Sequence, residues 1–276
     1  MLKITDLEQD VVHLAKHLPT FPAIVIQLLD MLRDESSSLE ILVRMARNDP
    51  VISANILARA NHIRRMHAQS DLADAFVAAS IIGINQVRRI VVTMGMNRFV
   101  SSVPGGPFLF HNSLAVAITA QEMAAFVGIS PDVAYTAGML HDVGQLCFHS
   151  MDETLFEKVY MASIADGNLL EREAQAFGAD HCQVGAQLAR HWNLPDEIHS
   201  AILTHHDDNT FTCPLQACIC LSVTVACALD IPESPKNRVE SLNSLALEKL
   251  GLGWGTPAMA DMFDRCVTRY KQMTKR

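Results

Sequence analysis

Apolar residues recur at three- and four-residue spacing along most of this chain, and this helical periodicity restricts the fold more than any other feature. Segments such as PAIVIQLLDML and NQVRRIVVTMGMNRFV follow the pattern without interruption. Pro50, Pro131 and Pro195 each stand at the start of such a segment. The first helical turn accepts proline because its N–H groups have no helical partner. The sequence therefore predicts an all-α protein.

The segment SSVPGGPFLF, residues 101–110, separates two long helical patterns with two prolines and two glycines. We place a junction between lobes at this point. The prediction is an N-terminal helical lobe over residues 1–103 and a second lobe over residues 108–230. Residues 231–276 are expected to begin with a loop, IPESPKNRVES, and to continue as a C-terminal helical extension.

Several features of the composition concern location and partners. No stretch reaches the roughly 20 uninterrupted apolar residues of a membrane span, and the N-terminus lacks a basic segment followed by an apolar run. The seven cysteines include no CxxC pair, which favours a reducing compartment. We therefore expect a cytoplasmic protein with no membrane partner. The sequence does not indicate which oligomeric state the protein adopts.

The net charge of -8 argues against general attraction to nucleic acid, because the phosphate backbone is met by clustered lysine and arginine. One local exception is a set of arginines in the N-terminal half that could form a basic patch. Its members are Arg59, Arg64, Arg65, Arg88 and Arg89. Charge runs of this kind are usually solvated faces, so nucleic acid is not the expected partner.

Five histidines and one aspartate lie on four separate predicted helices, mostly near a helix end. Isolated polar groups in an apolar core are costly unless they are paired or bound to a metal, and shared coordination would offset that cost. The clearest case is AGMLHDVGQL, in which a histidine and an aspartate interrupt an apolar helix. The candidate metal ligands are His111, His141, Asp142, His181, His205 and His206.

Imidazole and carboxylate together suit zinc, iron, manganese or nickel, and a carboxylate with two oxygens can bridge two ions. The sequence thus predicts a divalent transition metal, with one or two ions bound. The alternative is that these residues are hydrogen-bonded core or surface histidines. His191 is excluded from the set because it lies ten residues after His181, about 15 Å along a helix.

The order of these residues resembles the HD superfamily of metal-dependent phosphohydrolases, particularly its HD-GYP branch. The surrounding segments are more similar to the HDOD family, the HD-related output domains of bacterial signalling. The similar segments are LPTFPAIVIQLLDML, NDPVISANILARAN, AASIIGINQVRRIV, HNSLAVA, AGMLHDVGQL and HCQVGAQLARHWNLPDEIHSAILTHH. The resemblance covers roughly residues 14–230. It implies an HD-domain-like multi-helix bundle with an N-terminal helical lobe and a degenerate HD lobe.

The resemblance also assigns ligands, because all six candidate residues match ligand positions of the HD-GYP pattern. The last aspartate of that pattern is missing, and Val223 stands at the best-fitting position. The resemblance then implies one ion held by Asp142, His181, His205 and His206. A second, weakened site would have only His111, His141 and the shared Asp142.

Two further departures concern catalysis. The lysine that ends the family's HDxGK segment, suited to holding a substrate phosphate, is replaced by the neutral Gln145. No GYP segment follows His206, which argues against cyclic-di-GMP as a substrate. These losses favour a regulatory signalling domain that binds a protein partner. The retained histidines favour the alternative, a metal-dependent phosphohydrolase acting on a phosphomonoester or nucleotide, with Asp142 holding an ion that activates water.

Overall fold

The computed structural model describes residues 4, 6–15, 18, 50–101, 106–207, 210–234, 239, 241–253 and 255–274. Within these ranges all regular structure is helical, which confirms the all-α prediction. The helix expected in PAIVIQLLDML lies outside the described residues. Among the described residues no single helix has both the length and the hydropathy of a membrane span, although the bent pair Ala75–Ile82 and Ile84–Ser101 has them by length and composition.

Packing divides the chain into two compact units, one of residues 21–99 and the other of residues 1–20 with 100–276. The first unit contains α4 (Pro50–Met66), α5 (Ala75–Ile82) and most of α6 (Ile84–Ser101). Asp74 caps α5, since its carboxylate accepts from the N–H groups of Phe76 and Val77.

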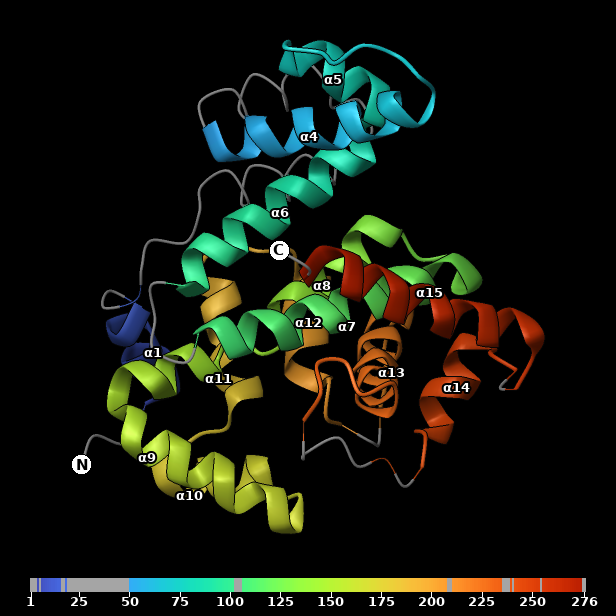
Figure 1. Ribbon diagram of the computed structural model, residues 1–276. Helices are drawn as coiled ribbons and strands as arrows, with labels where there is room; N and C mark the ends of the chain where they lie inside the picture. Colours follow the sequence, from blue (N-terminus) through green and yellow to red (C-terminus); the bar gives the residue numbers. More distant parts are fainter. Residues whose placement is uncertain are drawn as a thin grey trace. The chain divides into compact units, whose positions relative to one another are not determined.

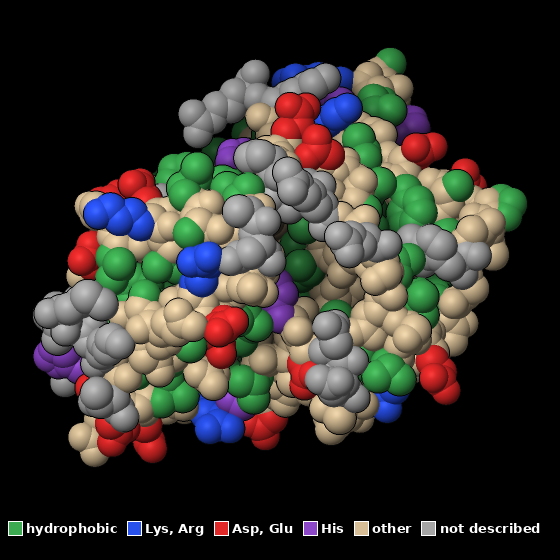
Figure 2. Space-filling model, turned by 90° about the horizontal axis from the view of Figure 1, so that it is seen from below, with side chains coloured by type: hydrophobic (Ala, Val, Ile, Leu, Met, Phe, Trp, Pro, Cys, Tyr) green, Lys and Arg blue, Asp and Glu red, His purple; other side chains and the backbone are tan. Residues whose placement is uncertain are grey.

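Two arginines of the predicted basic patch are satisfied within this first unit. Arg65 forms an exposed ion pair with Asp71, and Arg64 Nε donates to the Ser70 carbonyl oxygen. On the face shown in Figure 2, acidic and basic side chains are interspersed, and neither sign forms a broad patch where side chains are described.

The second unit contains the remaining helices that the structure describes. They are α1 (Leu7–Ala15), α7 (Gly106–Val127), α8 (Pro131–Leu140), α9 (Gln145–Asp166), α10 (Leu169–Phe177), α11 (His181–His191), α12 (Asp196–Thr204), α13 (Pro214–Ala228), α14 (Ser244–Leu250) and α15 (Pro257–Thr274). α8 begins at Pro131 as predicted, and Pro195 immediately precedes α12.

Helix α7 is the centre of this unit, where it packs against α8, α13 and α15 (Figure 1). Its side chains at Leu114, Ile118 and Gln121 are buried, whereas Ala125 is exposed. The α7 and α8 backbones meet closely at Gly138, where a β-carbon would lie 2.6 Å from the Ala117 Cα. This close approach places the C-terminal turn of α8 beside the middle of α7.

This grouping differs from the three predicted ranges in two respects. The N-terminal helix α1 packs with α9 and α11, and the Ile4 N–H donates to the Phe177 carbonyl oxygen at 2.6 Å. The C-terminal helix α15 packs on α7, where Arg265 and Arg269 pair with Glu122. Both ends of the chain therefore join the unit that carries the candidate site, because each end covers apolar surface on its helices.

Candidate metal centre

The candidate ligands are placed by helix ends rather than by helix interiors. His141 and Asp142 lie in the turn between α8 and α9, and His205 and His206 directly follow α12. His181 is the first residue of α11, where Asp180 and Gln183 form a reciprocal capping box. Three separate elements thus deliver polar side chains to one point.

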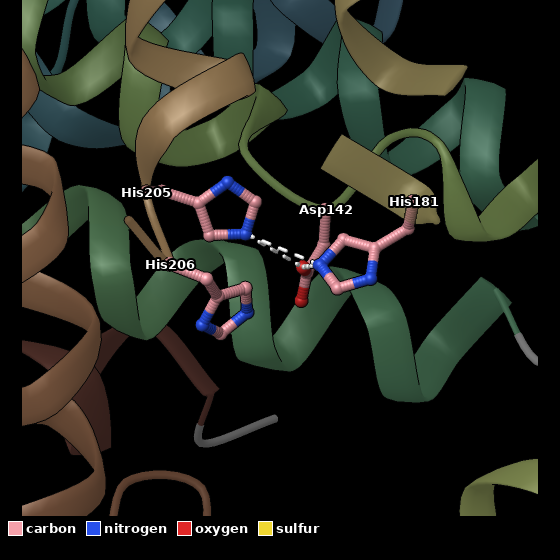
Figure 3. Close-up of side chains that lie close together, drawn as sticks. All are labelled: Asp142, His181, His205 and His206. Atoms are coloured by element: carbon pink, nitrogen blue, oxygen red, sulfur yellow. Dashed lines mark hydrogen bonds and ion pairs between the residues drawn. The ribbon is translucent and has the colours of Figure 1, made fainter. Parts of the chain in front are cut away.

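One carboxylate oxygen and two imidazole nitrogens form a nearly equilateral triangle (Figure 3). Asp142 Oδ1 lies 3.3 Å from His181 Nε2 and 3.5 Å from His205 Nε2. The two nitrogens are 3.2 Å apart. Ligands about 2.1 Å from one ion lie about 3.4 Å apart in tetrahedral geometry and about 3.0 Å apart when cis in octahedral geometry. The three distances therefore match the spacing of ligands around a single ion.

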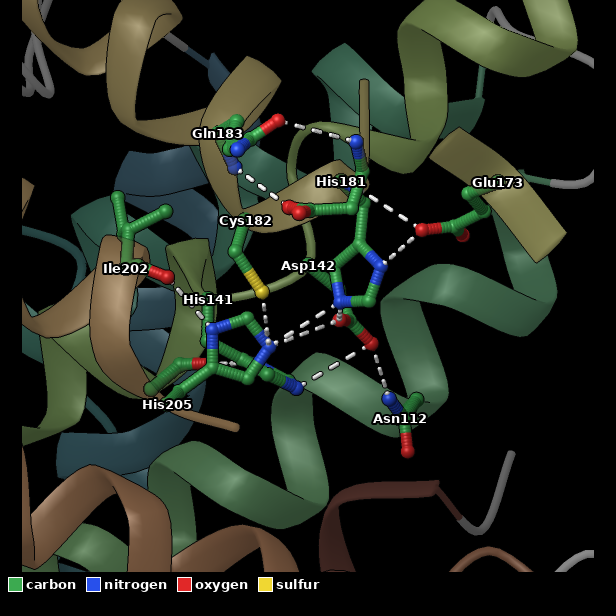
Figure 4. Close-up of polar contacts among 11 residues, drawn as sticks. Asn112, His141, Asp142, Glu173, His181, Cys182, Gln183, Ile202 and His205 are labelled. Atoms are coloured by element: carbon green, nitrogen blue, oxygen red, sulfur yellow. Dashed lines mark hydrogen bonds and ion pairs between the residues drawn. The ribbon is translucent and has the colours of Figure 1, made fainter. Parts of the chain in front are cut away.

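Acceptors at the two Nδ1 atoms determine which nitrogen of each imidazole carries the proton. The His205 Nδ1 donates to the Ile202 carbonyl oxygen at 2.6 Å, and the His181 Nδ1 donates to Glu173 Oε2 at 2.6 Å (Figure 4). A neutral imidazole with a proton on Nδ1 has only a lone pair on Nε2. Two lone pairs and a carboxylate oxygen then face one another, and they repel unless a cation or protons lie between them.

His206 forms the solvent edge of this cluster. Its side chain is exposed, yet one ring nitrogen lies within 4.8 Å of the ligand atoms of Asp142, His181 and His205. The four residues are the one group of potential ligands that the described part of the chain brings together in this way. They coincide with the four residues that the family resemblance assigns to one ion.

The other oxygen of Asp142 is already occupied. Asn112 Nδ2 donates to Asp142 Oδ2 at 2.6 Å, and His141 Nε2 lies 3.2 Å from the same atom. The His141 Nδ1 donates to the Gly138 carbonyl oxygen at 2.8 Å, which fixes the orientation of its ring. An amide donor therefore contacts the oxygen that the predicted second ion would share.

The structure does not gather His111 with this group. His111 is half-buried near the start of α7, and its Nδ1 lies 3.2 Å from the Tyr270 hydroxyl on α15. Val223, the position of the missing aspartate, is half-buried on α13. Both metal sites stay predictions, and only the four residues of the first lie with their potential ligand atoms within 4.8 Å of one another.

The electrostatics of the cluster favour positive charge between the ligands. Burial alone would raise the pKa of Asp142, but His141, His181 and His205 hold it well below its usual range. Burial alone would lower the pKa values of His181 and His205. Glu173 is the largest contributor that raises the pKa of His181. Cys182 and Asp142 raise the pKa of His205 to about 9. Without another cation, the site thus retains protons.

Three contributors to the site were missed from the sequence, namely Glu173, Asn112 and Cys182. A signal existed for Glu173, which lies between Leu169 and Phe177 at four-residue spacing on the buried face of α10. A glutamate on an apolar stripe needs a buried partner, and the N–H and Nδ1 of His181 supply it. Asn112 and Cys182 directly follow His111 and His181, but sequence adjacency does not show what they contact.

Comparisons with known proteins agree with this fold. The profile of the HDOD domain matches residues 18–208. Ribonuclease Y of Lactobacillus gasseri is 25% identical over 189 residues, which are 67% of this chain and 29% of that protein. This chain therefore spans less than a third of that relative.

Three solved structures share the fold. An HDOD domain protein of unknown function from Geobacter sulfurreducens has a TM-score of 0.71 at 23% identity, covering 95% of this chain and 90% of that chain. A candidate phosphohydrolase from Shewanella amazonensis has a TM-score of 0.70 at 22% identity, covering 96% and 98%. A candidate signal transduction protein from Marinobacter aquaeolei has a TM-score of 0.74 at 19% identity, covering 99% and 63%.

Proposed function

This chain belongs to the HDOD domain family, and from that premise we propose that it is a regulatory signalling module with a protein partner and one metal centre. The ligands of that centre would be Asp142, His181, His205 and His206. The observation that carries the proposal is the set of buried acceptor atoms, 3.2 to 3.5 Å apart, that face one another. Such an arrangement requires a cation or protons, and its spacing fits a divalent transition metal.

The role of the centre in this proposal is to join helix ends. Asp142 follows α8, His181 begins α11 and His205 follows α12, so one shared ion would hold three elements together. Glu173 and the Ile202 carbonyl oxygen orient two of the rings. A bound divalent ion would also supply Lewis acidity at this point. The resulting rigid unit would present its surface to a signalling partner.

Two features of the site support a regulatory role rather than hydrolysis. Gln145, where the HD pattern has its lysine, is buried and neutral, so it cannot offer a charge to a phosphate. Asn112 donates to Asp142 Oδ2, the oxygen that a second ion would share. The chain is therefore proposed to hold one ion rather than the pair that a dinuclear hydrolase uses.

Metal analysis tests the proposal directly. We expect about one transition-metal ion per chain in protein purified without chelators, and His205→Ala should retain at least tenfold less after dialysis because a buried ligand is lost. His191→Ala is the matched control, since His191 is exposed at the end of α11 and should leave the metal content unchanged. Chelation should also lower Tm, because a ligand that binds only the folded state adds about 2.7 kcal/mol at 100 times Kd.

Equal metal in wild type and His205→Ala would contradict the site, as would an absence of metal in both after supplementation with Zn²⁺, Mn²⁺ and Fe²⁺. The cluster would then be a proton-binding core, and the raised pKa values of His181 and His205 would describe its working state.

A metal-dependent phosphohydrolase remains the second candidate, and the exposure of His206 favours it. An ion bound beside an exposed ligand can be reached by water and by a substrate phosphate. We nevertheless expect no turnover of cyclic-di-GMP, because Gln145 is neutral and no GYP segment follows His206. Incubation of the metal-loaded protein with cyclic-di-GMP and, in parallel, with chromogenic phosphomonoesters and phosphodiesters checks this. Metal-dependent turnover that His205→Ala abolishes would replace the regulatory proposal with this one.

A further inference from the structure

A cysteine lies against the inner side of the histidine cluster. Cys182 follows His181 in the first turn of α11 and is only 4% exposed. Its Sγ lies 3.9 Å from His205 Nε2, the nitrogen that faces Asp142. Figure 4 shows the sulfur pointing toward the rings of His205 and His181. The thiol therefore approaches the same point as the proposed ligands.

Other buried thiols have a different environment. Cys218 donates to the Ala120 carbonyl oxygen at 3.7 Å, and Cys220 contacts the Asp207 carbonyl oxygen at 4.0 Å. These are ordinary backbone contacts of core cysteines. The contact of Cys182 is instead to an imidazole nitrogen whose other ring nitrogen is held by a backbone carbonyl.

We propose that Cys182 is a sulfur ligand of the metal centre, completing a buried set with Asp142, His181 and His205 and leaving His206 at the solvent edge. This inference rests on the proposed metal site and adds one donor to it. In tetrahedral geometry, a sulfur about 2.3 Å and a nitrogen about 2.1 Å from one ion lie about 3.6 Å apart. The observed Sγ to Nε2 distance exceeds that value by about 0.3 Å.

A thiolate changes which ion the site prefers. Carboxylate and imidazole alone accept manganese, iron, nickel and zinc, whereas a soft sulfur donor favours zinc over the hard cations magnesium and manganese. The position in the first turn of α11 also suits an anionic ligand, because the helix dipole favours negative charge there. The site is thus assigned to a zinc-like ion.

Substitution with Co²⁺ tests the sulfur ligand without reference to activity. The Co²⁺-loaded wild type should show a thiolate-to-cobalt charge-transfer band in the near ultraviolet. Cys182→Ser should lose that band while keeping visible ligand-field bands from the remaining ligands. The preference for Zn²⁺ over Mn²⁺, measured by competition, should fall about tenfold or more in Cys182→Ser. Cys218→Ser is the matched control, a buried cysteine with a backbone contact, and should keep both properties.

The outcomes separate this inference from the proposed function. Bound Co²⁺ with identical spectra in wild type and Cys182→Ser would overturn the sulfur ligand and leave the metal site standing. Failure of the wild type to bind Co²⁺ or Zn²⁺ would overturn the metal site itself. If Cys182→Ser does not fold, the wild-type spectrum still tests the sulfur ligand. Co²⁺ bound to the wild type without a charge-transfer band would contradict a thiolate ligand.

Discussion

Replacing Gly144 with alanine is expected to destabilise the unit that carries the cluster by more than about 3 kcal/mol. Gly144 lies two residues after Asp142, and a β-carbon there would be 2.1 Å from the His181 carbonyl oxygen and 2.7 Å from the Gly185 nitrogen. Both atoms are backbone, so no side-chain rotation can relieve the overlap. The turn between α8 and α9 would have to separate from α11.

The loss in free energy of unfolding should exceed the roughly 1–3 kcal/mol that overpacking a core site ordinarily causes. The whole free energy of unfolding of a typical protein is about 5–15 kcal/mol. Chemical denaturation of purified protein measures it, with metal content as a second readout, because separating α11 from the turn moves His181 away from Asp142. Gly253→Ala is the matched control: a β-carbon there meets only Thr256 Cγ2 at 3.8 Å. Gly144→Ala with near wild-type stability would show that the turn and α11 do not pack this closely.

Removing the carboxylate of Glu173 should have the second largest effect. Glu173 is fully buried on α10, and its Oε2 accepts from the backbone N–H of His181 at 2.9 Å and from the ring Nδ1 at 2.6 Å. Glu173→Ala leaves two buried donors without an acceptor and opens a cavity. Breaking a buried charged pair by deleting one partner typically costs about 3–5 kcal/mol. We expect a loss of this size in the free energy of unfolding.

Metal affinity distinguishes a role of Glu173 in orienting the His181 ring from a role in packing alone. Glu173→Gln keeps the volume and one acceptor oxygen but removes the charge behind His181, so metal affinity should fall about 10- to 100-fold with a smaller loss of stability. Glu171→Ala on the exposed face of the same helix should change stability by no more than about 0.5 kcal/mol. A Glu173→Gln variant with unchanged metal affinity would restrict Glu173 to a packing role.

The helices themselves could be predicted from the sequence because their signals are local. Apolar spacing and proline position require only neighbouring residues, and the start of α8 at Pro131 follows from them. The convergence of Asp142, His181 and His205 was predicted with help from the family resemblance, since the order of such residues along the chain carries that information. Composition alone would have left these residues as scattered polar groups in an apolar chain.

What only the tertiary structure decided is which atoms face one another between helices. The contacts of Cys182 with His205 and of Asn112 with Asp142 have no local sequence signal. The same holds for the contact of His111 with Tyr270 and for the packing of α1 and α15 on the site-bearing unit. Close backbone approaches, such as that of Gly144 to α11, fix the offset between neighbouring helices. Apolar periodicity predicts which face of a helix is buried. The offset between helices then determines which atoms meet at the interface.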